Sequence, residues 1–248
     1  MSIHTYKRQS NGKVVRVKSV DTVAKLRKRP DCVHSITTVT GDIKNDFLDF
    51  WKDKKIWELA HENPEWDLDK CIEARWGYRT HPTTGEQMTS SDFGTAAHES
   101  VENGLNHLKE GADYHDDYSP LTRPFFRAIE TSVHKPVWCE KMVLDERRRI
   151  GGTIDFVSKD AFGNYAIWDF KFRTSTKAYD KDMVQLSIAA DIIMNEENLD
   201  YLPQTHSVVF NCNDGEMKIT NWTERQRWEG VAWFDDQNKC YMRRNGLL

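Results

Sequence analysis

The chain has few cysteines, and their spacing excludes the common cysteine-bound metal centres. Its 248 residues include five cysteines that lie far apart, at Cys32, Cys71, Cys139, Cys212 and Cys240. No two of them form the Cys-x-x-Cys pair from which zinc ribbons and four-cysteine clusters are built. The sequence therefore predicts neither kind of centre.

Long apolar runs are also absent. No stretch approaches the roughly 20 apolar residues with which a helix crosses a bilayer. Residues 1–20 lack the apolar centre of a secretory signal peptide. We therefore expect no membrane partner and a location in the reducing cytoplasm.

An excess of positive charge, which is typical of nucleic-acid-binding proteins, is missing too. Lys plus Arg number 35 against 39 for Asp plus Glu, and the formal net charge is −4. Phosphate binding would then depend on local positive charge. Basic runs occur at residues 25–29 and 147–149. An ordinary solvated surface explains both runs as well, and this alternative stays open.

What the sequence contains is typical of a folded globular chain. Hydrophobic residues make up 38% and charged residues 30%, a balance that differs from that of disordered chains. No linker or internal repeat interrupts the sequence. We therefore expect a single domain over residues 1–248, with an N-terminal hairpin and helical elaboration.

Hydrophobic periodicity predicts both helices and strands. Helices are expected near residues 21–29, 45–61, 68–76, 91–110, 120–134, 179–195 and 224–243. Strands are expected near residues 3–7, 14–20, 35–40, 137–144, 150–158, 165–172, 206–212 and 216–220. An exposed loop is expected at residues 77–90. This order predicts an α/β fold with a mixed, largely antiparallel central sheet flanked by helices.

Two consecutive strands of this sheet bring charged side chains together. A short loop joins them, and antiparallel pairing about its centre puts Val157 opposite Ile167. The same register puts Asp155 opposite Asp169, so the two carboxylates share a face and lie close together. Lys171 is two residues beyond Asp169 and shares that face as well.

The other face of these two strands is uniformly apolar. It carries Ile154, Phe156, Ala166, Trp168, Phe170 and Phe172. We expect this face to lie in the core. A slip of one residue would bury both aspartates among aromatic rings, so the register is well determined.

Two aspartates and a lysine at close range have a specific chemical use. Neighbouring carboxylates repel, and a divalent cation between them relieves the repulsion and leaves positions for water and phosphate. Such a cation activates water and stabilises charge on a phosphoryl oxygen, and a lysine can orient the water or stabilise the transition state. An exposed salt bridge of Lys171 with Asp169 or Asp155 is the alternative, and these residues alone leave both open.

The pattern Gly-Gly-x-x-Asp at residues 151–155, followed by Asp-x-Lys at 169–171, resembles the PD-(D/E)XK nuclease superfamily and specifically its RecB-type branch. The segment at residues 94–98, which ends in His98, is similar to the first motif of that branch, where a helical histidine ligates a metal. The Ser-Ile-Thr-Thr-Val segment from Ser35, followed by a Trp-rich helix, is similar to the viral and mitochondrial genome maintenance exonucleases. The resemblance spans roughly residues 33–190, and its order and spacing make it fairly specific.

Three further positions compare with the branch. Gln185 lies on the helix after Asp-x-Lys, where the branch usually has Gln-x-x-x-Tyr, but Ala189 stands in place of the tyrosine. This departure puts the role of the tyrosine in doubt and leaves the metal ligands intact. Glu140 matches a glutamate that is often present on the strand before the hairpin. Taken alone, His98 is an ordinary helical histidine and Gln185 a helix-surface amide, and these alternatives stay open.

The resemblance implies a restriction-endonuclease-like α/β fold and a metal-dependent deoxyribonuclease. The ligands it implies for Mg²⁺ or Mn²⁺ are His98, Asp155, Asp169 and the Phe170 carbonyl. Lys171 is expected to act on the attacking water or the transition state, and Gln185 to orient the lysine or the DNA. Some relatives hold an iron–sulfur cluster with four cysteines. The scattered cysteines do not reproduce that arrangement, so no cluster is expected.

The related exonucleases pass a single strand through the site, so we expect an exonuclease that prefers single-stranded DNA with a free end. The aromatic helix at 47–57, the basic segment at 25–29 and the loop at 77–90 would line a channel for the strand. The alternative is that these aromatic residues pack the helices onto the sheet.

The implied setting is DNA replication, repair or recombination. The expected partners are DNA and a helicase, polymerase or single-strand-binding protein, and the location is the host cytoplasm for a phage-encoded chain. Three other functions remain as alternatives. They are a structure-specific endonuclease of the same fold, a non-catalytic nucleic-acid binding module and a hydrolase of small phosphoesters.

Overall fold

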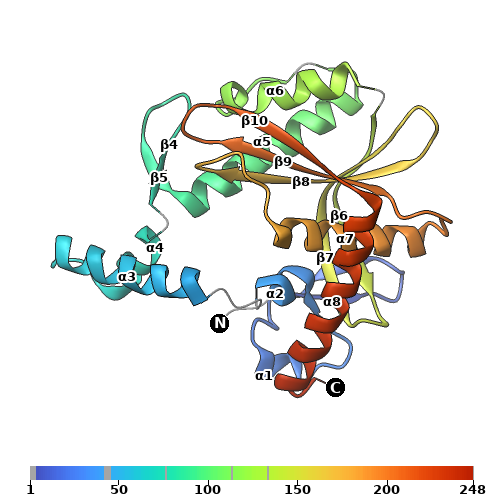
Figure 1. Ribbon diagram of the computed structural model, residues 1–248, viewed down its shortest axis with the longest axis horizontal. Coiled ribbons are helices and arrows are strands. Elements are labelled where there is room, and N and C mark those ends of the chain that lie inside the picture. Colours follow the sequence, from blue (N-terminus) through green and yellow to red (C-terminus); the bar gives the residue numbers. More distant parts are fainter. Residues whose placement is uncertain (1–3, 42–45, 76, 113, 133, 248) are drawn as a thin grey trace.

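A mixed β-sheet with helices on both faces organises the chain in the computed structural model (Figure 1). The structure describes residues 4–41, 46–75, 77–112, 114–132 and 134–247, with the backbone alone at residues 46–52 and 73. The sheet contains β1 (Thr5–Arg8), β2 (Val14–Arg16), β3 (Val33–Ser35), β6 (Lys135–Asp145), β7 (Ile150–Lys159), β8 (Tyr165–Arg173), β9 (Gln204–Asn211) and β10 (Met217–Trp222). A separate hairpin consists of β4 (Tyr78–Thr80) and β5 (Gln87–Thr89).

The strand order explains why the sheet is mixed. It runs β10-β9-β8-β7-β3-β1-β2, and β6 also pairs with β7. The β3–β7 and β8–β9 pairs are parallel, and the other pairs are antiparallel. A parallel pair needs a crossover, and α7 supplies it between β8 and β9. The predicted α/β class, with a mixed sheet flanked by helices, is confirmed.

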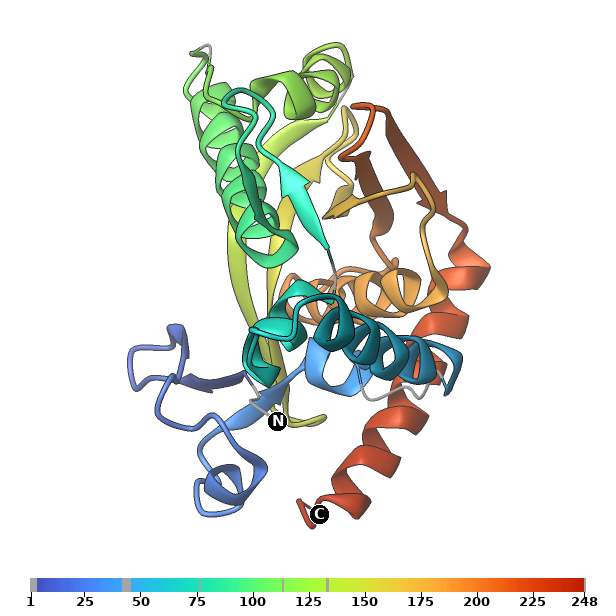
Figure 2. The same ribbon diagram turned by 90° about the vertical axis from the view of Figure 1, so that its left-hand side faces the viewer.

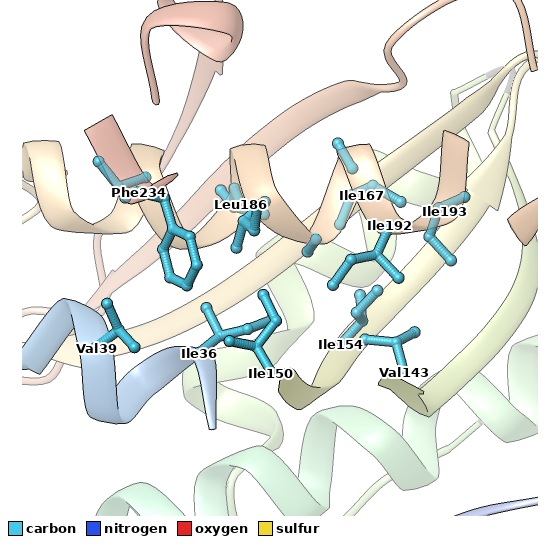
Figure 3. Close-up of a cluster of buried hydrophobic side chains, with 14 of the residues drawn as sticks. Ile36, Val39, Val143, Ile150, Ile154, Ile167, Leu186, Ile192, Ile193 and Phe234 are labelled. Carbon is cyan, nitrogen blue, oxygen red and sulfur yellow. The ribbon is translucent and has the colours of Figure 1, made fainter. Parts of the chain in front are cut away.

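Helices form a layer on each face of the sheet. The helices are α1 (Val23–Leu26), α2 (Ile36–Gly41), α3 (Asp46–Glu62), α4 (Leu68–Ala74), α5 (Ser90–Lys109), α6 (Ser119–Glu130), α7 (Asp180–Glu196) and α8 (Glu224–Arg244). On one face α2, α7 and α8 bury an aliphatic cluster that includes Ile36, Ile150, Ile167, Leu186 and Phe234 (Figure 3). On the other face α5 and α6 cover an aromatic cluster that includes Phe125, Phe156, Trp168, Phe170 and Phe210. No described helix combines the length and apolarity that a bilayer crossing demands.

The predicted hairpin register is confirmed where the strands pair. Val157 lies opposite Ile167, and Phe156 lies opposite Trp168. The predicted apolar face needs one correction. Ile154 belongs to the aliphatic cluster under α7, whereas Phe156 belongs to the aromatic cluster under α5.

The predicted strand at residues 35–40 is wrong for most of its length. Only Val33–Ser35 is extended, and the β-branched residues after it form α2. The Ser35 hydroxyl accepts a hydrogen bond from the Thr38 amide at 3.0 Å, as an N-cap does. Ile36 and Val39 are then buried against α7 and α8. The cap and this burial outweigh the β propensity of the segment.

The two basic runs are largely engaged within the fold. Arg148 is buried and pairs with Asp145, Asp191 and Asp235, so it links the β6–β7 turn to α7 and α8. In the run at 25–29, Arg27 donates to the Asn245 carbonyl at 2.6 Å, beside the end of α8. These runs support the structure, and neither lines the cleft described below.

Helices α3 and α4 pack on each other and extend away from the sheet (Figures 1 and 2). Trp57 on α3 is 61% exposed, so this ring does not pack α3 onto the sheet. Three aromatic residues of the predicted helix, Phe47, Phe50 and Trp51, have side chains outside the described ones. Ile3 and Asn45, where a strand and a helix were predicted to begin, lie outside the described residues. The segment at 77–90, expected to be a loop, contains the β4–β5 hairpin.

Candidate active site

An open stretch of β7 creates the candidate site. Along one edge β7 pairs with β6 over its whole length. Along the other edge β8 pairs with residues 156–159 and β3 with residues 150–151. Within the described residues, the stretch from Gly152 to Asp155 therefore has no strand partner on that edge. A cleft of about 350 Å³ opens there, lined by residues of β1, β2, α2, β6, β7, β8 and α7.

Asp155 marks the point where β7 and β8 separate. Its register partner would be Asp169, but the backbone ladder stops one pair earlier, at Phe156 and Trp168. The Phe170 amide instead donates to Oδ2 of Asp155 at 2.9 Å. The carboxylate thus accepts from an amide that has no backbone partner on β7 at this point. This bond holds the carboxylate in the fork, the place where β7 and β8 separate.

Asp169 is held by two side chains from different elements. It is 4% exposed, and its Oδ1 accepts from Lys171 Nζ at 2.7 Å and from Gln185 Nε2 at 3.2 Å. Its Oδ2 is buried and has no hydrogen-bond partner among the described residues. Gln185 reaches this carboxylate from α7, on the aliphatic side of the sheet. The arrangement leaves one carboxylate oxygen available to a ligand.

His98 approaches the same fork from the opposite side of the sheet. It lies on α5, where Nδ1 is 3.8 Å from Oδ2 of Asp155 and the ring lies edge-on to Phe172. Burial lowers the pKa of His98, although the Asp155 carboxylate and the Phe170 backbone work against this shift. A lowered pKa keeps the imidazole neutral near pH 7, and metal binding requires the neutral form.

Glu140 faces Asp155 across β6 and β7. Its neighbours Cys139 and Lys141 pair with Phe156 and Ile154. Its φ of 48° is uncommon for a residue with a side chain, and such backbone strain is concentrated at functional sites. Burial raises the pKa of Glu140 to about 8, and the charges of Asp155 and Glu102 add to this shift.

Carboxyl groups outnumber ammonium groups among the described residues of the site. Burial raises the pKa of Asp169, Lys171 opposes this shift and Asp155 adds to it. Burial alone would lower the pKa of Lys171, but Asp169 and Asp155 outweigh that effect and raise it. One ammonium group therefore faces the carboxyl groups of Asp155, Asp169 and Glu140. A divalent cation would relieve this imbalance.

The residues predicted from sequence meet within one region of the fold. Asp155, Asp169, Lys171 and Gln185 line the same cleft, and so does Ala189, one helical turn after Gln185. His98 and Phe170 reach Asp155 from the side. Among the described residues, no group of three or more His, Cys, Asp or Glu side chains is arranged so that it could hold a metal ion, and this includes His98, Asp155 and Asp169. The Phe170 carbonyl is the additional ligand that the resemblance implies.

One wall of the cleft was not predicted from sequence. His4, Tyr6 and Arg16 of the N-terminal hairpin line it together with the acidic residues. A Cβ at Gly151 would lie 2.8 Å from Tyr6 Cβ, and one at Gly152 would lie 3.0 Å from Ile36 Cδ1. The Gly-Gly pair thus lets β1 and α2 approach β7 beside Asp155. No local pattern in the first 20 residues signals this contact.

The comparisons with known proteins do not identify a family. Neither the protein-family models nor the curated proteins match this chain. A solved structure from Eubacterium rectale, named "Putative exonuclease", is similar over 86% of this chain and 68% of its own, with 12% identity and a TM-score of 0.38. This similarity is too low to support a function. The function is therefore inferred from the geometry of the site.

The contact at Gly151 predicts a loss of stability on enlargement. In Gly151→Ala the new methyl group would press on Tyr6 Cβ, which cannot swing away as a side-chain end can. We expect the free energy of unfolding to fall by about 1–3 kcal/mol, measured by urea denaturation. Gly94→Ala is the control, because no atom lies near its Cβ and it is in a helix; it should gain about 0.5–1 kcal/mol. Unchanged stability of Gly151→Ala would contradict the close packing of the hairpin on β7.

Proposed function

We propose that this protein is a metal-dependent nuclease of the PD-(D/E)XK type that hydrolyses phosphodiester bonds of DNA. The observation that carries the proposal is the meeting of Asp155, Asp169 and Lys171 at the open edge of β7. Asp169 is 4% exposed, which disfavours the alternative of a solvent-exposed salt bridge. A carboxylate is expensive to bury, and a structural ion pair gains little from such burial.

Magnesium or manganese is the cofactor that this donor set favours. The proposed ligands are Asp155, Asp169, His98 and the Phe170 carbonyl. Carboxylate and carbonyl oxygens suit hard divalent cations, and the imidazole suits manganese as well. The proposal is supported by the buried Oδ2 of Asp169, which has no hydrogen-bond partner in the described part of the chain, and by the excess of carboxyl groups. When bound, the cation would stabilise charge on the phosphoryl oxygens and lower the pKa of a water molecule.

The chain's own residues position the reacting groups. Lys171, held by Asp169, would orient the attacking water or stabilise the charge that develops on the phosphate. Gln185 keeps Asp169 in place, and the Phe170 amide keeps Asp155 in place. We infer that Gln185 is a positioning residue, since it reaches Lys171 only through Asp169.

Activity should depend on a divalent cation. We expect cleavage of end-labelled DNA with Mg²⁺ or Mn²⁺, none after removal of metal with EDTA, and poor activity with Zn²⁺. Readdition of Mg²⁺ after EDTA treatment is the control for irreversible damage. Full cleavage in metal-free buffer would exclude the proposed mechanism.

Variants of the three central residues should lose turnover and keep their fold. Asp155→Asn, Asp169→Asn and Lys171→Ala remove a proposed ligand or the ammonium group, and we expect cleavage rates to fall by a factor on the order of 10³ or more. His98→Ala should be less severe if His98 serves an auxiliary metal position. Asp236→Asn, at a position exposed on α8, is the control and should keep the wild-type rate. Thermal melting checks the fold. A wild-type rate in any of the first three would place the active site elsewhere.

For the substrate we propose a single strand of DNA with a free end. The support is the exposed aromatic surface of α3, where Trp57 is 61% exposed and its ring centroid lies 3.9 Å from that of His61. Exposed rings bind single strands by stacking on bases. The basic segment at 25–29 is not part of this surface, because it lies beside α8.

The free-end requirement is tested by the topology of the substrate. Linear single strands, linear duplex and closed single-stranded circles are compared under one Mg²⁺ condition. We expect rapid degradation of the linear single strand, slower degradation of the duplex and intact circles. Nicking of circles as fast as linear strands would make the protein an endonuclease. Binding without cleavage of any DNA would make it a binding module.

A further inference from the structure

The cleft continues past the catalytic groups to the N-terminal hairpin. Arg16 on β2 pairs with Tyr6 on β1. Tyr6 Oη lies 3.4 Å from Oγ1 of Thr153, and Thr153 precedes Asp155 by two residues on β7. Arg16, Tyr6 and Thr153 all line the same cleft as Asp155 and Asp169. The hairpin thus places a guanidinium group in the cleft at the side of the proposed reaction centre.

The charge of Arg16 is available to a ligand. Its side chain is exposed, and it forms no ion pair or hydrogen bond with another described residue. Two nearby cations are engaged with carboxylates, since Arg8 binds Glu146 and Lys171 binds Asp169. His4, beside Arg16, has a pKa lowered by burial and by the Arg16 charge. Arg16 is therefore a positive group that is not ion-paired with a described carboxylate.

The cleft needs such a group to hold DNA. The carboxylates of Asp155 and Asp169 repel a polyanion, and the chain as a whole is acidic. A strand that places one phosphate at these carboxyl groups must be held by contacts to its other phosphates. A guanidinium group binds a phosphate with two parallel hydrogen bonds and never loses its charge.

We propose that Arg16 binds a backbone phosphate of the DNA strand next to the scissile one, so that the N-terminal hairpin sets the register of the strand in the cleft. This inference rests on the proposed nuclease function and adds the residue that positions the substrate. The close packing of Tyr6 on Gly151 fixes the distance between Arg16 and the catalytic carboxylates. Arg16 is a positioning residue, because the phosphate it contacts does not react.

Binding is measured first, separately from turnover. Fluorescence anisotropy with a single-stranded oligonucleotide compares the parent protein with Arg16→Gln, Arg16→Lys and Lys18→Gln. Lys18 is the matched control, because it is exposed on the same segment, carries the same charge and does not line the cleft. All four proteins carry Asp155→Asn so that the strand stays intact. Thermal melting checks that the exposed Arg16 can be replaced without unfolding.

We expect Arg16→Gln to weaken binding by a factor on the order of ten, the loss of one charge-assisted contact. The slope of log K against log salt should become shallower by about 0.7, the value for one phosphate contact on a single strand. Arg16→Lys should recover the slope and part of the affinity, and Lys18→Gln should behave as the parent. In the active enzyme Arg16→Gln should raise KM and leave kcat within about twofold. Equal slopes for Arg16→Gln and Lys18→Gln would overturn the proposal.

An uncharged methylphosphonate in place of one phosphate of the oligonucleotide identifies which phosphate Arg16 contacts. One methylphosphonate is moved along the oligonucleotide, a position at a time. We expect one position, next to the cleaved linkage, where the methylphosphonate weakens binding by the parent protein. At that position it should not weaken binding by Arg16→Gln any further. If the methylphosphonate weakens binding by Arg16→Gln as much as binding by the parent at every position, the proposed contact is refuted. Cleavage and salt-dependent binding by wild type would still uphold the nuclease in that case, whereas their absence would exclude both proposals.

Discussion

One edge of β7, at Gly152–Asp155, pairs with no described strand, and the rest of the site depends on this constraint. The pairing of β7 with β8 and with β3 stops on either side of Gly152–Asp155, and the amides and carbonyls left unpaired there need other partners. Asp155 supplies one of them through its bond to the Phe170 amide. The same fork admits side chains from both layers of helices. A fully paired β7 would bury this edge and close the cleft.

The two helical layers contribute different properties to this fork. From the aliphatic side, Gln185 of α7 fixes Asp169, while from the aromatic side His98 of α5 stands beside Asp155. Both helices are anchored by large buried clusters, so the positions of these polar groups are set by packing. Rigid support of this kind suits a site that must hold several carboxyl groups at short range against their mutual repulsion.

The chemistry of the site follows from burial combined with charge. The raised pKa of Glu140 arises from its burial and from neighbouring carboxylates, and Lys171 alone does not balance them. Elsewhere the fold balances buried charge within itself, as Arg148 does with Asp145, Asp191 and Asp235. The two clusters therefore differ in kind. The Arg148 cluster stabilises the contact between the sheet and its helices, whereas the carboxyl groups of Asp155, Asp169 and Glu140 are not matched one to one by cations among the described residues.

The sequence by itself determined the register of β7 and β8, because alternation with period two places Asp169 and Lys171 off the aromatic face in one register only. It also determined most helices, whose apolar periodicity is local. It misplaced residues 36–40, where the Ser35 cap and burial outweigh β propensity. Only the tertiary structure decided that β8 separates from β7 at Asp155, that Glu140 faces Asp155 and that Arg16 enters the cleft. These outcomes depend on contacts between segments more than a dozen residues apart, and no local pattern of side chains encodes such contacts.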